Sequence, residues 1–263
     1  MRTRLFIPAA AALLLALAAC TKDELSSPSG GVEGAYPLQI ARITLAVEGG
    51  EAQPWGAPAT RVSENTDGTG STFDADDPFA VQIDGEDEVR TYTVQDDGSV
   101  KAETPLYWSD REENHTVTAW YPAKSGTLDL SDQSQSLAYL LSGTGTGDYD
   151  TPVILSFTHR LAKVRVTPAD NAPLDQVHSL QLYTCTECTY TQESGPSGTT
   201  EGWVEMMKCV YTIEGQEVTC WEANVVPGYK IEKLMANNDG EERNLSTAIT
   251  PVAGKFYNIT LTE

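Results

Sequence analysis

The sequence carries little positive charge. Its 263 residues include 17 lysines and arginines against 38 aspartates and glutamates, which gives a formal net charge of −21. Such an acidic chain repels phosphate backbones and anionic headgroups. We therefore exclude nucleic-acid binding, and we expect the acidic excess to favour solubility.

Motifs of enzymes and cofactor-binding proteins are also lacking. The three histidines, His115, His159 and His178, do not have the close spacing of metal ligands. No Gly-x-Ser-x-Gly nucleophile elbow, phosphate-binding loop or dinucleotide fingerprint occurs. We therefore expect no enzyme activity, no catalytic residue, no metal and no cofactor.

Long hydrophobic runs are absent beyond the start of the chain. Two arginines precede a short apolar stretch, 5–17, and two alanines then lead to Cys20. This arrangement predicts an export signal over residues 1–19, which is too short to span a bilayer comfortably. Positions 17–20 also match the bacterial lipobox, in which the cysteine is lipidated. We predict lipidation of Cys20, and the alternative is an unmodified Cys20 after a plain secretory signal.

Cysteine is scarce, and its count is informative. If Cys20 carries lipid, four of the five cysteines remain for other roles: Cys185, Cys188, Cys209 and Cys220. An even number suits disulfide bonds in an exported protein. We predict structural disulfides, with free thiols and a metal site as the alternatives.

The spacing of these cysteines restricts how they pair. If residues 214–215 form a two-residue loop, Cys209 lies directly opposite Cys220 on two antiparallel strands. In an extended strand Cys185 and Cys188 point to opposite faces, roughly 10 Å apart. A bond between these two is then excluded unless a turn intervenes.

Amphipathic helices are not evident anywhere after the export signal. Short runs of alternating apolar residues recur instead, separated by glycine, proline, aspartate and asparagine, which is typical of antiparallel strands. Turn signals at 96–98 and 214–215 predict two hairpins. The predicted strands are 38–47, 79–83, 90–94, 99–102, 117–121, 153–166, 179–191, 203–213, 216–223 and 256–261, and 128–141 is ambiguous between helix and strand.

The pattern predicts an all-β protein with two β-sandwich domains in series. Residues 1–19 are the lipoprotein signal peptide, and 20–37 form a flexible tether in which serine, glycine and proline are frequent. The glycine-rich stretch 143–147 separates two halves. We therefore place an N-terminal sandwich at 38–150 and a C-terminal sandwich at 151–263.

Several stretches carry a family resemblance when they are taken together. Residues 153–166 contain three features in succession: an apolar pair, then Phe-Thr-His, then Leu-Ala-Lys-Val. Residues 250–261 form the last predicted strand and the residues that lead into it. Residues 118–122 read Thr-Ala-Trp-Tyr-Pro, and 60–81 contain Thr-Arg and later an acidic pair before Phe-Ala-Val. In this order the stretches resemble the fimbrillin-like family of Bacteroidales, the subunits of type V pili and their relatives.

The resemblance implies two tandem transthyretin-like antiparallel β-sandwich domains and a structural role. In type V pili a protease that cuts after arginine removes the first strand, and the vacated groove accepts a strand from a neighbouring subunit. Here 38–47 would be the removable strand and Arg61-Val62 the cut site, with Arg42 as its rival. The alternative is an anchor or accessory lipoprotein that is never cut. At the other end, 256–261 would either swap itself or belong to a subunit that only accepts.

The resemblance also implies a location and partners. Residues 21–24, Thr-Lys-Asp-Glu, resemble the acidic export signal of surface lipoproteins of the Bacteroidetes, which implies a surface-exposed place on the cell outer membrane. The expected partners are other fimbrial subunits, the outer membrane through the lipid on Cys20, and a host or bacterial surface ligand in cell adhesion. The alternative is a surface glycan-binding lipoprotein, whose platform would need exposed aromatics; the candidates are Trp55, Trp108, Trp120, Trp203 and Trp221.

Overall fold

The regular structure consists of β-strands alone. The computed structural model describes residues 36–45, 63–64, 71–111, 114–169, 177–192, 194–213, 216–237 and 240–261. Throughout these ranges every regular element is a strand, which confirms the all-β class. No helix within them is long and apolar enough to cross a membrane.

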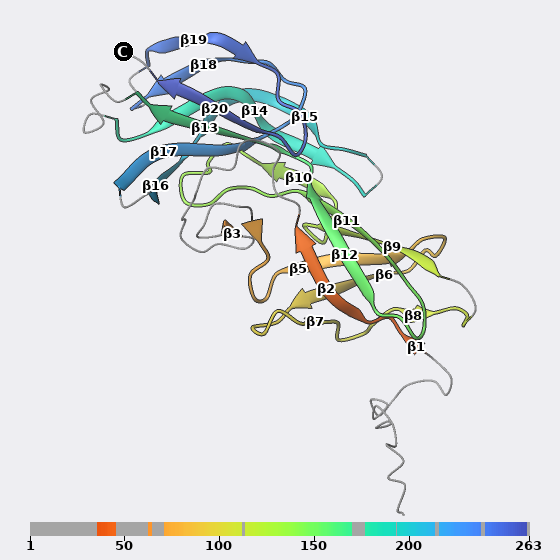
Figure 1. The fold of residues 1–263 in the computed structure, drawn as a ribbon. Coiled ribbons are helices and arrows are strands. Elements are labelled where there is room, and N and C mark those ends of the chain that lie inside the picture. Colours follow the sequence, from red (N-terminus) through yellow and green to blue (C-terminus); the bar gives the residue numbers. More distant parts are fainter. Residues whose placement is uncertain are drawn as a thin grey trace, which may run out of the picture. The chain divides into compact units, whose positions relative to one another are not determined.

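Seven strands between residues 40 and 159 build one sheet, shown in warm colours and green in Figure 1. Its strands, in spatial order, are β2 (Ile40–Leu45), β12 (Val153–His159), β11 (Leu141–Gly147), β9 (His115–Tyr121), β5 (Pro78–Ile83), β6 (Val89–Val94) and β7 (Val100–Lys101). Two short ladders accompany it: β1 (Tyr36–Pro37) with β8 (Tyr107–Trp108), and β3 (Ser63–Glu64) with β4 (Ser71–Thr72).

The strands after β12, together with β10, build two further sheets. The four-stranded sheet has the order β16 (Met207–Ile213), β17 (Gln216–Val225), β13 (Ala162–Pro168) and β20 (Phe256–Leu261). The five-stranded sheet has the order β10 (Gly126–Asp129), β14 (Leu180–Tyr190), β18 (Ile231–Ala236) and β19 (Glu242–Ile249), and β15 (Ser197–Glu205) also pairs with β14. The ambiguous stretch 128–141 therefore contributes to the strands β10 and β11 and to no helix.

Two ladders correct the expectation of purely antiparallel sheets. β2 runs parallel to β12, and β20 runs parallel to β13. In each pair the two strands are far apart in sequence, so a long connection joins them instead of a hairpin, as parallel pairing requires. In each pair the strand from the end of the chain, β2 or β20, lies at an edge of its sheet.

Gly143–Gly147, which we expected to separate the halves, forms most of strand β11 inside the seven-stranded sheet. The glycines are needed because β12 lies very close: a Cβ on Gly143 would come 2.9 Å from the Phe157 ring, and one on Gly145 would come 2.4 Å from the Ile154 carbonyl oxygen. The chain visits the five-stranded sheet once with β10, returns to the first sheet with β11 and β12, and leaves it finally at 160–161, between β12 and β13. A division into two sandwiches remains a proposal, with this passage as its natural boundary.

Apolar side chains gather in three clusters. The first contains Phe79, Val117 and Phe157 of the seven-stranded sheet, together with Tyr211 of the four-stranded sheet. The second lies between the two later sheets and contains Trp221. The third is smaller and surrounds two cysteines of β14; its buried members are Leu130, Leu140, Leu161, Cys185, Cys188, Tyr190 and Val226.

Candidate functional site

Strand β2 lies at the edge of the seven-stranded sheet, alongside β12 (Figure 1). The two strands pair from Ile40 opposite Val153 to Leu45 opposite Phe157, with one irregularity near Val153. Among the described strands, none forms a ladder on the other side of β2. β2 therefore covers the backbone of β12, whose N–H and C=O groups would otherwise form an open edge.

The side chains of this segment close part of the first core. Leu38, just before β2, and Ile40 are buried, and Ile43 and Leu45 are half-buried against the same cluster. The backbone N–H of Leu38 also donates a hydrogen bond to the carbonyl oxygen of Leu106 at 2.7 Å. Segment 38–45 thus covers part of the first core with apolar side chains and, within the described part of the chain, forms a ladder with β12 alone; we call it the apolar plug.

Strand β20 takes the corresponding place in the four-stranded sheet. It pairs in parallel with β13, from Phe256 opposite Lys163 to Leu261 opposite Pro168. Tyr257, Ile259 and Leu261 pack against the second core, which confirms the predicted alternation along this strand. The last described strand is therefore an edge strand, as β2 is.

The two edge strands share a short sequence. β2 ends in Ile-Thr-Leu at 43–45, and β20 ends in Ile-Thr-Leu at 259–261. In both, the isoleucine and the leucine pack against a core. Thr44 lies on the other face, where its hydroxyl donates to the Ser156 hydroxyl at 3.2 Å, and Thr260 is exposed. The apolar spacing of β20 therefore matches that of β2.

The strands that hold these two edges follow each other directly in the chain. β12 ends at His159, β13 begins at Ala162, and the second of the two residues between them, Leu161, is buried in the third cluster. His159 is buried beside Tyr139, with ring centroids 6.0 Å apart, which agrees with a packing role. One continuous segment, the one with the strongest family resemblance, thus provides both pairing edges.

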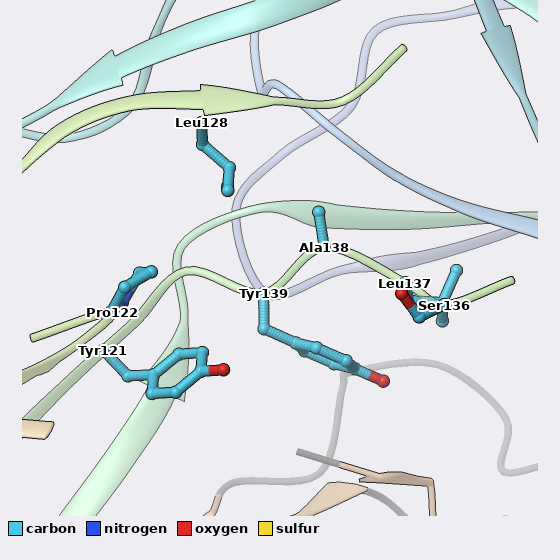
Figure 2. A pocket seen from close by; sticks show the side chains of 7 residues that line it. All are labelled: Tyr121, Pro122, Leu128, Ser136, Leu137, Ala138 and Tyr139. Carbon is cyan, nitrogen blue, oxygen red and sulfur yellow. The ribbon is translucent and has the colours of Figure 1, made fainter. Parts of the chain in front are cut away.

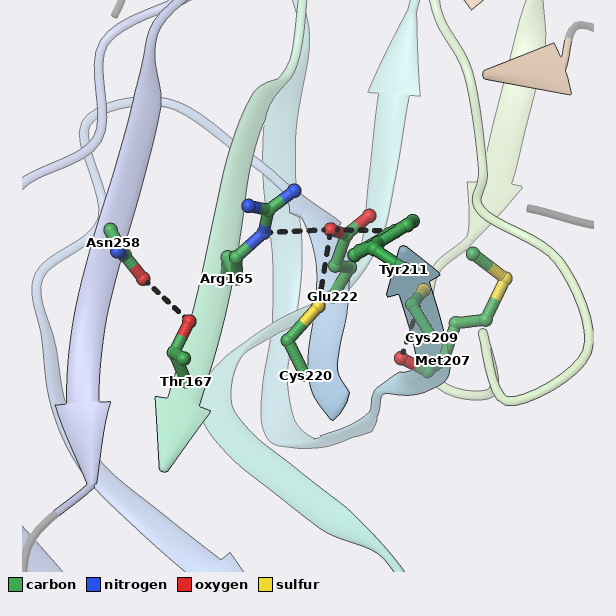
Figure 3. Close-up of polar contacts among 8 residues, drawn as sticks. All are labelled: Arg165, Thr167, Met207, Cys209, Tyr211, Cys220, Glu222 and Asn258. Carbon is green, nitrogen blue, oxygen red and sulfur yellow. Dashed lines mark hydrogen bonds and ion pairs between the residues drawn. The ribbon is translucent and has the colours of Figure 1, made fainter. Parts of the chain in front are cut away.

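A buried charged pair lies on the four-stranded sheet. Arg165 on β13 donates from Nε to a carboxylate oxygen of Glu222 on β17 at 2.9 Å, and the Tyr211 hydroxyl donates to the same oxygen at 3.0 Å (Figure 3). The guanidinium also lies 5.1 Å from the ring centroids of Tyr211 and Phe256. Arg165 therefore links β13, β16, β17 and the edge strand β20.

The surroundings of this pair keep neighbouring acids protonated. Burial, and then the Glu222 charge, raise the pKa of the Tyr211 phenol. A hydrogen bond with Cys209, and then burial, raise the pKa of the Cys220 thiol. Both groups therefore stay neutral near physiological pH and cannot act as nucleophiles there. The contacts of the cluster join β13, β16 and β17.

Our sequence reasoning missed this pair. The available signal was the alternation itself: Arg165 stands between Val164 and Val166, which pack into the second core. A charged residue in such a strand normally faces water. Here the opposite face is buried too, with Arg165 4% and Glu222 0% exposed.

The predicted register of the second cysteine pair is confirmed, but its disulfide is not present. Cys209 lies opposite Cys220, as a two-residue connection between β16 and β17 requires. Both are free thiols: the Cys209 Sγ lies 3.7 Å from the Met207 carbonyl oxygen, and the Cys220 Sγ lies 3.7 Å from a Glu222 carboxylate oxygen (Figure 3). Each thiol thus has an oxygen acceptor on its own strand.

Cys185 and Cys188 correct a second expectation. They are also free thiols, but they do not point to opposite faces, because both are buried in the third cluster. The pairing of β14 with β15 shifts register between Cys185 and Cys188, and such bulges break the alternation of side chains. Burial raises the pKa of each thiol to about 11. These cysteines are therefore unreactive core residues at neutral pH.

The other predicted site residues have mixed outcomes. Cys20, Arg61, Val62 and Trp55 lie outside the described residues. Of the remaining tryptophans, three are buried in cores and one is half-buried; these are Trp108, Trp120 and Trp221, and then Trp203. Most of the suggested aromatic platform is therefore core.

A pocket of about 400 Å³ lies where β9 ends. Figure 2 shows the rings of Tyr121 and Tyr139 beside Pro122, with Leu128 across the opening. The remaining lining residues are Ser136, Leu137 and Ala138. None of the described lining residues is charged or a histidine, so the pocket offers apolar contact and the hydroxyl groups of two tyrosines and one serine.

Comparison with known proteins decides the family. The sequence model of the fimbrillin-like family matches residues 60–262. This chain belongs to the fimbrillin-like family. The match includes β12, β13 and β20, which carry both pairing edges. The family is one of fimbrial and adhesion proteins with structural roles, so a place on the cell surface or in a fimbria follows. No curated protein sequence matches the chain.

Solved structures of similar fold come from Bacteroides species. A candidate cell adhesion protein of Bacteroides uniformis is similar with a TM-score of 0.56 and 19% identity over 90% of this fimbrillin-like chain and 95% of its own. One from Bacteroides ovatus has a TM-score of 0.56 and 14% identity over 86% and 92% of the two chains. A third, from Bacteroides thetaiotaomicron, has a TM-score of 0.50 and 16% identity over 84% and 91%. At these identities the likeness shows a shared fold.

Proposed function

We propose that this fimbrillin-like protein is a structural or accessory subunit of a fimbria that accepts a strand from a neighbour along β12. The observation that carries the proposal is the position of β2, an apolar edge strand paired on one side alone among the described strands. If it leaves, an unpaired backbone row and part of an apolar core become available to another chain. Strand addition uses this combination of main-chain bonds and side-chain pockets.

The further steps of the proposal rest on the sequence. Lipid on Cys20 anchors the exported chain to the outer membrane, and cleavage between Arg61 and Val62 separates β2 from the body of the protein. Two transthyretin-like sandwiches, before and after the β12–β13 passage, form the subunit. Cell adhesion is the biological role, in keeping with the candidate adhesion proteins that share the fold.

An arginine-specific protease tests the cleavage step. The chain from Thr21 onward is incubated with the protease, and the product's new N-terminus is sequenced. We expect a single early cut before Val62, followed by a ladder of oligomers on gels run without boiling. An Arg61→Lys variant should resist the cut, and an Arg42→Lys variant is the matched control that should be cut normally.

Three results would count against this proposal. The cut could fall after Arg42, Arg61 could resist the protease in the wild type, or the cut product could stay monomeric. The first two would remove the proposed cut site. The third would favour an intact anchor or accessory protein over a subunit that polymerises.

A further inference from the structure

The outer face of the five-stranded sheet carries an aromatic pair beside a small pocket. Tyr183 on β14 lies opposite Trp203 on β15, and their rings meet edge to face with centroids 5.3 Å apart. Both side chains are half-buried, while their strand neighbours Leu182 and Val204 are buried in the second core. The pair therefore faces away from that core, on strands that Figure 1 shows side by side.

The pocket next to this pair has a volume of about 270 Å³. Its aromatic walls are Tyr183 and Tyr229, and its charged rim comes from β15 and β18 and the residue just before β18; the rim residues are Glu201, Lys230, Glu232 and Lys233. At about 30 Å³ for each water molecule, the space equals roughly nine waters. This is comparable to one sugar ring with its hydroxyl groups.

The rim has no net charge, although the chain as a whole carries −21. Its two amines balance its two carboxylates. Within the rim Lys230 forms an ion pair with Glu232, while Lys233 pairs at 2.5 Å with Glu242, which does not line the pocket. A rim with equal numbers of amines and carboxylates offers both donors and acceptors to a ligand with hydroxyl groups.

The walls are held in place before any ligand arrives. The Tyr229 hydroxyl donates to the Gly198 carbonyl oxygen at 2.9 Å, and the Lys233 ammonium lies 5.8 Å from the centre of the Tyr183 ring. Gly198 makes room for this arrangement, because a Cβ there would come 2.8 Å from the Tyr229 ring. A fixed aromatic wall binds flat apolar faces at low entropic cost.

We infer that this pocket is a binding site for a neutral sugar residue of a surface glycan. The C–H face of the ring lies on Tyr183 or Tyr229, and its hydroxyls bridge the amines and carboxylates of the rim. A charged ligand fits less well because the rim is balanced. The site is independent of strand exchange, since β14, β15 and β18 belong to neither pairing edge.

Saturation-transfer NMR on the uncleaved chain from Thr21 onward tests the inference. The probes are methyl glycosides of galactose, mannose and N-acetylglucosamine, with sialic acid and glucosamine as charged comparisons. We expect at least one neutral glycoside to bind with a dissociation constant of about 1 mM, as suits a single small ring. Tyr183→Ala should weaken this binding at least tenfold.

Two further variants make the test specific. Tyr149→Ala removes a 43% exposed tyrosine that also packs edge to face on an aromatic ring, and it should leave binding unchanged. If Tyr183→Ala does not fold, Glu201→Gln and Lys230→Gln change exposed rim residues and should each reduce binding. No binding of any neutral glycoside at 20 mM (about 20-fold above the expected constant), binding of charged sugars alone, or binding unaffected by the pocket variants would overturn the inference. Because cleavage is not needed, failure here leaves the strand-exchange proposal standing.

Discussion

Removal of β2 should make the first half of this fimbrillin-like protein unstable. A chain that begins at Val62 lacks Leu38 and Ile40, which are 2% and 8% exposed, and the half-buried Ile43 and Leu45. Full burial of one aliphatic side chain contributes about 1.5–3 kcal/mol, so the loss is about 6 kcal/mol. A domain is stable by only about 5–15 kcal/mol, so this loss takes a large share of it.

Urea unfolding and peptide complementation measure the effect. The chain beginning at Val62 should unfold at a much lower urea concentration than the intact chain. A peptide of residues 36–47 should raise the midpoint again, because it restores the ladder with β12 and the apolar plug. A peptide of residues 255–263 should do so in part, since it carries the same Ile-Thr-Leu. A 36–47 peptide with aspartate in place of Ile43 and Leu45 is the matched control and should have no effect.

The reasoning fails in two cases. Equal midpoints for the intact and shortened chains would mean that β2 contributes little to the core. Equal rescue by the aspartate peptide would mean that binding in the groove does not depend on the apolar side chains of the peptide.

Three other predictions concern the interior. Arg165→Met should cost about 3–5 kcal/mol in urea unfolding because it leaves the Glu222 charge buried without this partner, and adding Glu222→Leu should recover much of the loss. Gly143→Ala should cost about 1–3 kcal/mol in the same assay, because its Cβ meets the Phe157 ring, whereas Ser142→Ala on the same strand should be mild. Iodoacetamide should modify the native Cys185 and Cys188 slowly at pH 8, since burial raises the pKa of each from 9.0 to about 11. Because the unfolded thiols ionise first, stability should fall as pH rises from about 9 towards 11, and mass spectrometry and pH-dependent unfolding check these two effects.

Local patterns predicted the strands well. The alternation at 79–83 and 256–261 gives β5 and β20, because one face of each must meet a core. The connection at 214–215 fixed the register of β16 and β17, and Cys209 does lie opposite Cys220. Both features depend on neighbours in sequence, which is the information a single sequence contains.

Features set by distant contacts were not predictable in this way. The composition of 143–147 suggests a loop, but its glycines serve the close approach of Phe157 and the Ile154 carbonyl from the next strand. The bulge in β14 directs the side chains of Cys185 and Cys188 toward the same cluster, and this bulge arises from the pairing with β15. The parallel pairing of both edge strands also depends on which strand is left open after the others have formed.

The contents of the two pairing edges differ in a way that bears on strand exchange. The β12 side chains that face the core beside β2 are Val153, Leu155 and Phe157, which lose only apolar contact if β2 leaves. β13 beside β20 instead carries the buried Lys163 and Arg165, and the Arg165 guanidinium lies against Phe256 of β20 itself. Departure of β20 would expose buried charges to solvent or leave them without their contacts, and this costs more free energy than opening an apolar groove. This difference favours β2 as the strand that leaves and β12 as the edge that accepts, so the subunit would receive a strand from a neighbour while keeping its own last strand in place.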